Sequence, residues 1–228
     1  TQAAKAASEK QQIPIIFGPI NNPIDAGIVS DLKRPGKNIT GVMLTDSTAK
    51  QIEWALRFSP KIKRILIPYN PTDASSNHSY VKAKEAVKLF GLELVPHQVK
   101  SQSDIDKLLS TFPKNIDLIF FPRDAMVMTR AEDFAAIANK RQIILTGTRL
   151  EMAQRGALFG FGFDGFELGR QAARLADQVL QGIPPGDLPV ETAEDYLSIN
   201  LNTAVNAGIK VPEHILRQAH IVIRPEQN

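Results

Sequence analysis

RILIPYNPTDASSNHSYVKAKEAVKLFGLELVPHQV, residues 64–99, is typical of a strand, a helix and a second strand in succession. The flanking segments 64–69 and 92–99 are short and apolar, whereas 76–90 carries apolar residues at three- and four-residue spacing. Gly91 stands where a glycine commonly ends a helix. Strands joined in this way by a helix lie parallel, so the segment predicts an α/β fold.

The same alternation continues on both sides of this segment. Further strands are predicted at 13–18, 38–43, 116–121, 142–147, 157–163 and 196–201, and further helices at 49–58, 103–112, 130–139, 166–180 and 202–207. Because most strands are followed by a helix, the sheets are expected to be mainly parallel, with right-handed crossovers and helices on both faces. Ligands of such sheets bind beyond the carboxyl ends of the strands, where we therefore expect the site residues.

The composition is that of an ordinary globular protein, with 43% hydrophobic and 22% charged residues among 228. The net charge of +3 is spread among 24 acidic residues, unlike the concentrated basic surface of a nucleic-acid-binding protein. Cysteine is absent, which removes disulfides, thiolate metal sites and cysteine nucleophiles. The four histidines lack the spacing of a metal pair, and no serine stands in a G-x-S-x-G turn, so an enzyme is not indicated.

GFGFDG, residues 160–165, matches the sequence pattern of a glycine-rich turn that binds dinucleotides. Such a site also needs a second strand with an acidic residue about 20 positions on, whereas proline-rich GIPPGDLP (182–189) follows here. Asp164 would repel a pyrophosphate, but it suits the following helix as an N-cap, with Glu167 three residues on. We therefore expect no cofactor, and we assign the glycines to a strand that crosses between two lobes.

Five segments, in order over nearly the whole chain, resemble one protein family. They are IPIIFGPINNPIDAGIVSDLKRPGKNITGV (13–42), RILIPYNPTDASS (64–76), DLIFFPRDAMV (117–127), RGALFGFGFDGFELGRQAARLADQVLQG (155–182) and LPVETAEDYLSINLNTAVNAGIKVP (188–212). The family is that of the substrate-binding proteins of ABC transporters, in the group that includes tryptophan- and tyrosine-type binders. The resemblance implies a type I periplasmic-binding fold, in which two lobes close on a ligand in an interlobe cleft.

The resemblance also implies how the chain is divided. Crossovers that act as hinges are expected near 43–60, 163–165 and 186–197. Residues 1–58 and 164–190 would form a partial first lobe, and 59–163 with 191–228 the second lobe. Family members begin with additional strand–helix units, and this chain would enter near the end of the third, with TQAAKAASEK (1–10) as its helix. Exposed strand edges of an incomplete lobe would favour a homodimer.

The function implied by the resemblance is the capture of a small organic ligand, an amino acid or related compound, for an ABC permease in the membrane. The location would be periplasmic, or extracellular and membrane-anchored, although the sequence shows no signal peptide. The alternative is a ligand-sensing input domain of a signalling receptor. Residues 1–228 do not distinguish the two functions, nor do they identify the ligand.

The candidate ligand contacts follow the predicted strands. In the second lobe they are Tyr69, Asn70, Asp73, Ser75, Ser76, Arg123, Asp124 and Thr148, and in the first lobe and the crossovers they are Phe17, Gly18, Asn21, Asn22, Thr45, Asp46 and Asp164. Small-molecule sites combine apolar walls with a few convergent polar groups, which is the basis of this selection. The aromatic residues Trp54, Phe58, Phe112 and Phe134 are instead expected in the core.

Each group of candidates has a structural alternative. Backbone N–H groups and hydroxyls at 70–76 could hold a carboxylate, or Ser75 or Ser76 could only cap the next helix. Asp73 and Asp124 could accept a ligand ammonium, or could have capping or surface roles.

The chain also departs from the family pattern at two of the candidate positions. Family members usually carry Thr-Asp-Asn where this chain has Arg123, Asp124 and Ala125. Arg123 would therefore bind an extra carboxylate of the ligand through two hydrogen bonds, or form an ion pair with Asp124 at the surface. Family members also tend to have an aspartate where Asn22 stands, and Asn22 carries no charge.

Overall fold

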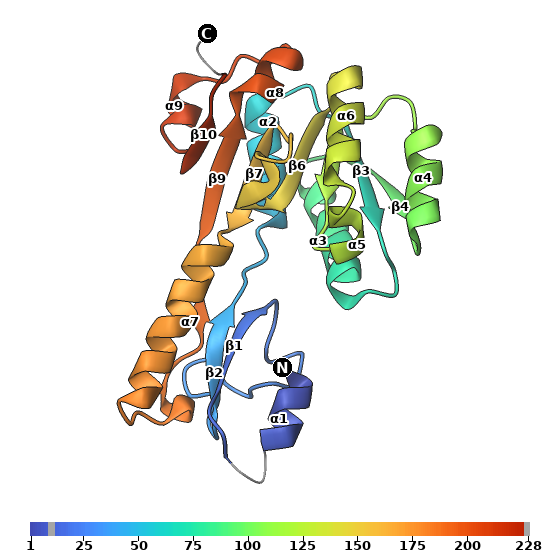
Figure 1. Ribbon diagram of the computed structural model, residues 1–228. Helices are drawn as coiled ribbons and strands as arrows, with labels where there is room; N and C mark the ends of the chain where they lie inside the picture. Colours follow the sequence, from blue (N-terminus) through green and yellow to red (C-terminus); the bar gives the residue numbers. More distant parts are fainter. Residues whose placement is uncertain (9–11, 226–228) are drawn as a thin grey trace. The chain divides into compact units, whose positions relative to one another are not determined.

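The computed structural model, which describes residues 1–8 and 12–225, divides into two units (Figure 1). Unit 1 consists of Thr1–Asp46 and Phe163–Glu194, and unit 2 of Ser47–Gly162 and Asp195–Asn228. The sequence predicted divisions after residues 58, 163 and 190, whereas the structure places them after 46, 162 and 194. The largest difference concerns the helix at 48–58, whose apolar face packs in the core of unit 2.

Unit 2 is built on a seven-stranded sheet in the order β10-β9-β7-β6-β5-β3-β4. Its strands are β3 (Arg64–Tyr69), β4 (Glu93–Gln98), β5 (Leu118–Phe121), β6 (Ile144–Arg149), β7 (Phe159–Phe163), β9 (Asp195–Asn200) and β10 (Ile221–Ile223). The pairs β3–β4, β3–β5, β5–β6 and β9–β10 are parallel, and the predicted α/β class is confirmed.

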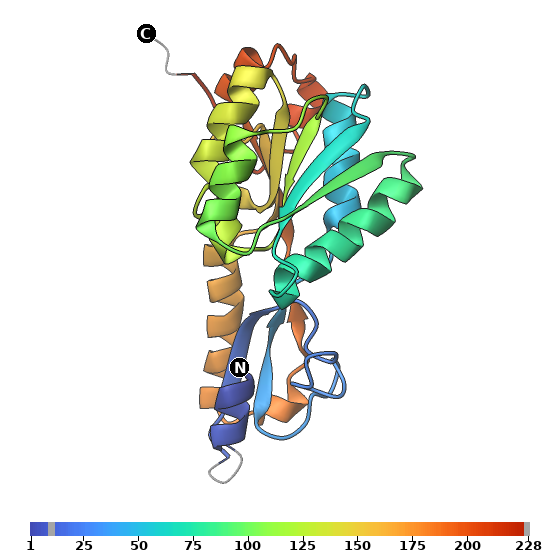
Figure 2. The ribbon, with the colours of Figure 1, turned by 90° about the vertical axis from the view of Figure 1, so that its right-hand side faces the viewer.

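Helices cover both faces of this sheet (Figure 2). They are α2 (Thr48–Phe58), α3 (Ala74–Leu89), α4 (Gln102–Ser110), α5 (Ala125–Met128), α6 (Ala131–Arg141), α8 (Leu201–Asn206) and α9 (Glu213–Leu216). Neighbouring strand residues point to opposite faces, so in β3 Ile65 and Ile67 pack with α2 and α3, while Leu66 packs with α4 and α6. A sheet buried on both faces explains why its strands are continuous apolar runs.

The aromatic residues expected in the core are confirmed there. Trp54 and Phe58 from α2 lie in one cluster with Phe159, on whose ring the Phe58 ring stacks at 4.9 Å. Phe112 and Phe134 belong to the cluster on the opposite face of the sheet.

Unit 1 contains a smaller parallel sheet in the order β1-β2-β8, from β1 (Ile15–Ile20), β2 (Ile39–Met43) and β8 (Glu191–Thr192). The helix α7 (Gly165–Leu180) buries Leu168 and Leu175 against one face, in a cluster that includes Val42. The short helix α1 (Gln2–Ser8) begins the chain, and residues 9 and 10 of the predicted helix lie outside the described residues.

Six short elements were not predicted from the sequence. These are β8, β10, α5, α9 and the two 3-10 turns, Leu150–Met152 and Pro185–Asp187. None of them is longer than four residues, which is too short for a helix or strand period to repeat. No helix within residues 1–8 and 12–225 is long and apolar enough to cross a membrane.

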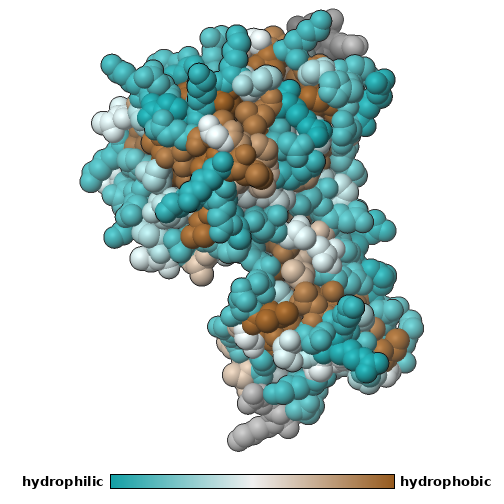
Figure 3. Space-filling model, turned by 180° about the vertical axis from the view of Figure 1, so that it is seen from behind, coloured by the Kyte–Doolittle hydropathy of each residue, from teal (hydrophilic) through white to brown (hydrophobic). Residues whose placement is uncertain are grey.

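The surface is mainly hydrophilic, with hydrophobic areas between polar side chains on the face drawn in Figure 3. The most exposed large hydrophobic side chains described are Leu89, Phe166, Leu180 and Val205. They belong to three different helices, α3, α7 and α8, and single exposed apolar side chains are usual on soluble domains.

Candidate functional site

Three neighbouring strands of unit 2 bring predicted site residues to one edge of the sheet. β3, β5 and β6 are adjacent and parallel, so their carboxyl ends lie at the same edge. Asn70 follows β3, Arg123 and Asp124 follow β5, and Thr148 is the residue before the last in β6. The structure therefore places these four candidates along one edge, which we call the carboxyl edge.

The turn from β3 into α3 is held by its own polar side chains. The backbone N–H of Asn70 donates to Oγ of Ser76 at 2.8 Å, and Oδ1 of Asn70 accepts from the backbone N–H of Thr72 at 3.0 Å. The backbone N–H of Ser76 donates to Oδ1 of Asp73 at 2.8 Å. Asp73 is thus the N-cap of α3, and the alternative prediction that Ser75 or Ser76 caps this helix was wrong. The extended backbone at Asp73 makes it the residue that precedes the first helical turn.

Tyr69 and Ser76 are buried beneath this turn. The ring of Tyr69 stacks on Tyr80 from α3 with centroids 4.2 Å apart, and its hydroxyl accepts from Nε2 of Gln98 at 3.3 Å. Ser76 is fully buried, and its hydroxyl accepts the hydrogen bond from the backbone N–H of Asn70. In this structure both side chains support the turn that carries Asn70.

The loop after β5 is tied to α3. The backbone N–H of Arg123 donates to Oγ of Ser79 at 3.1 Å, and Ser79 in turn donates to the carbonyl of Ser75 at 3.0 Å. Ser79 was not among the candidates, since no sequence pattern connects a helical serine to a loop 44 residues away. It fixes the positions of Ser75 and Arg123 relative to each other.

Asp124 has one oxygen in a structural role and one without a partner. Oδ1 accepts from the backbone N–H of Val127 at 3.0 Å and caps α5, while Oδ2 is buried and has no hydrogen-bond partner within the described part of the chain. The residue is only 5% exposed, so its predicted alternative of a surface pair with Arg123 was wrong.

Thr148 presents a second buried polar group at the carboxyl edge. It is 4% exposed, and its Oγ1 has no hydrogen-bond partner among residues 1–8 and 12–225. Buried polar groups are normally paired, and an unpaired one is available to a ligand or an ordered water. Together, Asp124 Oδ2 and Thr148 Oγ1 offer one acceptor and one group that can donate or accept.

Three of the candidates in unit 1, Phe17, Gly18 and Asn22, lie in β1 or shortly after it. Phe17 and Gly18, the last residues of the predicted strand at 13–18, lie inside β1, and the Phe17 side chain packs in the core with Ile39. The β1 strand continues to Ile20 because its pairing with β2 extends that far. Asn22 forms a turn, since its Oδ1 accepts from the backbone N–H groups of Ile24 and Asp25 at 3.1 Å.

The remaining unit 1 candidates lie at the ends of strands. Asn21 follows β1 and is partly buried, and Thr45 and Asp46 follow β2 and are exposed. Asp164 follows β7 and begins α7.

The structure gives the GFGFDG segment a structural role. Asp164 caps α7, with Oδ1 accepting from the backbone N–H groups of Phe166 and Glu167 at 2.7 and 3.1 Å, which confirms the predicted N-cap. A side chain on Gly162 would lie 1.9 Å from the carbonyl oxygen of Thr148, and one on Gly160 would lie 2.3 Å from that of Arg149. These glycines allow β7 to approach the backbone of β6, just where the chain passes from unit 2 to unit 1.

The described shifts in pKa in unit 2 belong to ion pairs and helix caps. Arg155 donates from Nε and Nη2 to the two oxygens of Glu132 at 2.6 and 2.7 Å, and these hydrogen bonds lower the pKa of Glu132. At the start of α4, the backbone N–H of Lys100 and the hydroxyl of Ser101 lower the pKa of Asp104. Both are structural effects.

Comparisons with known proteins agree with the resemblance seen in the sequence. A family described as ABC transporter substrate binding protein matches residues 1–223. A protein of Clostridioides difficile (strain R20291) named tyrosine-binding protein is 29% identical over 196 residues, which are 86% of this chain and 57% of that protein. The chain thus spans less than two thirds of the length of this curated relative.

Solved structures match as well. The ABC domain from Streptococcus pneumonia in complex with L-Trp has a TM-score of 0.81 at 28% identity, covering 95% of this chain and 76% of that one. A conserved domain protein from Vibrio cholerae has the same TM-score and identity, covering 92% of this chain and 71% of that one. The type I periplasmic-binding fold expected from the sequence is therefore confirmed.

Proposed function

The chain belongs to the ABC transporter substrate-binding protein family, and from this premise we propose that it captures an aromatic amino acid for import. The carboxyl edge of unit 2 provides one wall of the site. The interlobe cleft, the hinge closure and the delivery to an ABC permease, all expected from the resemblance, are parts of this proposal, as is a location outside the cytoplasmic membrane.

The observation that carries the proposal is the convergence at the carboxyl edge. Asn70, Arg123, Asp124 and Thr148 come from three separate segments, and adjacent parallel strands bring them together. Asp124 Oδ2 and Thr148 Oγ1 are buried without partners in the described residues. An unpaired buried carboxylate oxygen is costly by itself, and a ligand ammonium would offset that cost.

The ligand class follows from the relatives and from the charges at this edge. One relative is named a tyrosine-binding protein, and a similar structure contains L-Trp. An amino acid carries an ammonium for Asp124 and a carboxylate for Arg123 or for the backbone N–H groups of the β3–α3 turn. Arg123 stands where the family usually has a threonine, which makes a second carboxylate on the ligand the alternative.

Isothermal titration calorimetry of the protein at its full natural length tests this proposal. L-tyrosine and L-tryptophan are expected to bind with a dissociation constant of about 1 μM or below, and L-alanine far more weakly. L-glutamate distinguishes the alternative, since tighter binding of glutamate would assign the second carboxylate to Arg123.

Variants at the carboxyl edge connect the binding to these residues. Arg123→Ala is expected to weaken binding of the favoured amino acid at least about tenfold, because the charge-assisted hydrogen bond to the ligand is lost. The midpoint of thermal unfolding should not fall. Lys84→Ala, which removes an exposed charge from α3, is the matched control. Unchanged affinity in both Arg123→Ala and Asp124→Asn would remove this edge from the site, and the absence of binding by every amino acid would contradict the proposed function itself.

A further inference from the structure

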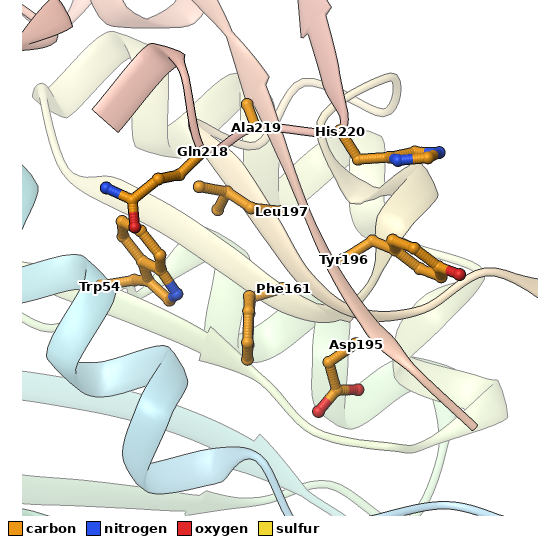
Figure 4. A pocket seen from close by; sticks show the side chains of 8 residues that line it. All are labelled: Trp54, Phe161, Asp195, Tyr196, Leu197, Gln218, Ala219 and His220. Atoms are coloured by element: carbon orange, nitrogen blue, oxygen red, sulfur yellow. The ribbon is translucent and has the colours of Figure 1, made fainter. Parts of the chain in front are cut away.

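Unit 2 contains a hollow of about 430 Å³ beside α2 and β9, and none of the four carboxyl-edge residues lines it (Figure 4). The side chains that face it are Trp54 from α2, Phe161 from β7, Asp195 and Leu197 from β9, and Gln218 and Ala219 from the segment before β10. No residue of this set was a candidate in the sequence, because four distant segments form it.

Tyr196 and His220 also line the hollow, but their side chains lie on the other side of β9. Asp195 and Leu197 are two positions apart in β9 and point to one face, whereas Tyr196 points to the other, where its ring lies 4.6 Å from His220 (Figure 4). The backbone N–H of His220 donates to the carbonyl of Leu197 at 2.7 Å. This hydrogen bond fixes Gln218 and Ala219 beside β9.

The hollow combines aromatic walls with one acidic side chain. The rings of Trp54 and Phe161 are 6.2 Å apart and inclined at 46°, so they form two sides of an apolar corner. Asp195 is the acidic group on the same side of β9 (Figure 4). The nearby guanidinium of Arg57, 4.7 Å from the Trp54 ring, is already paired with Glu53, which compensates its charge.

Trp54 adds a hydrogen-bond donor to this corner. Its Nε1 is buried and has no acceptor in the part of the chain that the structure describes. An indole N–H without an acceptor is unfavourable, so a bound atom that accepts a hydrogen bond offsets that cost. The volume of the hollow lies in the range that holds small organic molecules, roughly 300 to 1,000 Å³.

We propose that this hollow is a second binding site, which takes a small aromatic amine. The ring of the ligand packs against Trp54 and Phe161, its ammonium pairs with Asp195, and a ring hydroxyl is the acceptor for Trp54 Nε1. An amino acid fits less well, because its carboxylate is attached next to the ammonium and is repelled by Asp195. The site thus selects against the very class of ligand proposed for the carboxyl edge.

The single tryptophan of the chain reports directly on this site. Three matched probes separate the contributions to binding: tyramine has the ring, the hydroxyl and the ammonium, 4-ethylphenol lacks the charge, and L-tyrosine adds a carboxylate. Tyramine is expected to change the Trp54 emission, when excited where phenols do not absorb, and to bind about tenfold more tightly than 4-ethylphenol.

Two variants make the test specific. Asp195→Asn keeps the shape of the side chain but removes its charge, so tyramine and 4-ethylphenol should then bind equally. Arg123→Ala, at the carboxyl edge, should leave tyramine binding unchanged, with circular dichroism as the check that both variants are folded. Equal affinities of the two probes for the unaltered protein, an unchanged difference in Asp195→Asn, or competition between tyramine and L-tyrosine would overturn the proposal. A failure of amino acids to bind would count only against the proposed import function.

Discussion

The hydroxyl of Ser79 accepts a hydrogen bond from the backbone N–H of Arg123 over 3.1 Å, joining α3 to the loop after β5. Ser79 is 4% exposed, and its removal would leave a partly buried N–H group without this acceptor. We expect Ser79→Ala to lower the free energy of unfolding by about 1 to 2 kcal/mol and to weaken amino acid binding by displacing Arg123. Urea unfolding and calorimetry measure the two effects, with exposed Asn77→Ala on the same helix as the control. A loss of stability with unchanged affinity would limit Ser79 to a structural role.

Asp124 and Asp73 both cap helices, but they differ in burial. Asn is nearly as good an N-cap as Asp, so Asp124→Asn should retain the cap and change stability by less than about 0.5 kcal/mol. The lost charge should nevertheless weaken amino acid binding about tenfold or more, if Oδ2 accepts the ligand ammonium. Asp73→Asn, an exposed cap, is expected to leave affinity within a factor of about two. If calorimetry shows a larger loss of affinity for Asp73→Asn than for Asp124→Asn, the ligand ammonium binds Asp73 instead.

Asp164 was a candidate both for ligand binding and for capping, and two substitutions separate these roles. Asp164→Ala removes the acceptor for the backbone N–H groups of Phe166 and Glu167 and should cost about 1 kcal/mol of stability. Asp164→Asn should restore most of that stability, because its side-chain oxygen can also cap α7. If Asp164→Asn remains stable but binds amino acids more weakly, the carboxylate also contacts the ligand.

Gly162 and Gly165 are three residues apart and should respond oppositely to alanine. A Cβ on Gly162 would lie 1.9 Å from the carbonyl oxygen of Thr148, and backbone cannot yield as a flexible side chain can. We expect Gly162→Ala to lower stability by several kcal/mol, about 3 or more, or to prevent folding. At Gly165 nothing lies within 4 Å of the added methyl, so Gly165→Ala should be neutral or stabilise by up to about 1 kcal/mol. Thermal melting of the two variants side by side tests the pair, and similar midpoints would contradict the close approach of β7 to β6.

The Glu132–Arg155 ion pair predicts a pH dependence of stability. Hydrogen bonds from Arg155 lower the pKa of Glu132 from its ordinary value of 4.5, so the contribution is present above that value and is lost as the pH falls through the folded-state pKa. Because the Glu132 side chain is 62% exposed, the contribution is limited to about 0.5 kcal/mol at neutral pH. Glu132→Gln should therefore destabilise the protein at pH 7 but not at about pH 3. Urea unfolding at both pH values provides the measurement, and an equal deficit at both would assign the effect to packing.

The sequence predicted most elements of the fold because their signals are local. A strand such as 64–69 is recognised by its apolar run, and a helix such as 166–180 by its period, without knowledge of any partner. The N-cap at Asp164 was equally local. The N-cap of α3 could not be chosen from the sequence alone, because Asp73, Ser75 and Ser76 are all good capping residues. The backbone conformation at Asp73 decides among them.

Site residues were predicted where they follow a strand, and were missed where only packing brings them close. Asn70, Arg123 and Thr148 were selected one strand at a time, but which strands lie side by side is a property of the sheet order. Ser79 carries no sequence signal for its hydrogen bond to a loop 44 residues away. The predicted strand at 13–18 ended too early, because the pairing that extends β1 to Ile20 depends on β2.

The sequence by itself determined the α/β class, the alternation of strands and helices and the residues at most strand ends, since these depend on interactions within a few residues. Only the tertiary structure decided that α2 packs in unit 2, that β3, β5 and β6 are neighbours, and that Trp54, Phe161 and Asp195 surround one hollow. Hydrophobic burial explains this division. It is non-directional, so a sequence pattern shows that a face must be buried but not which distant segment will cover it.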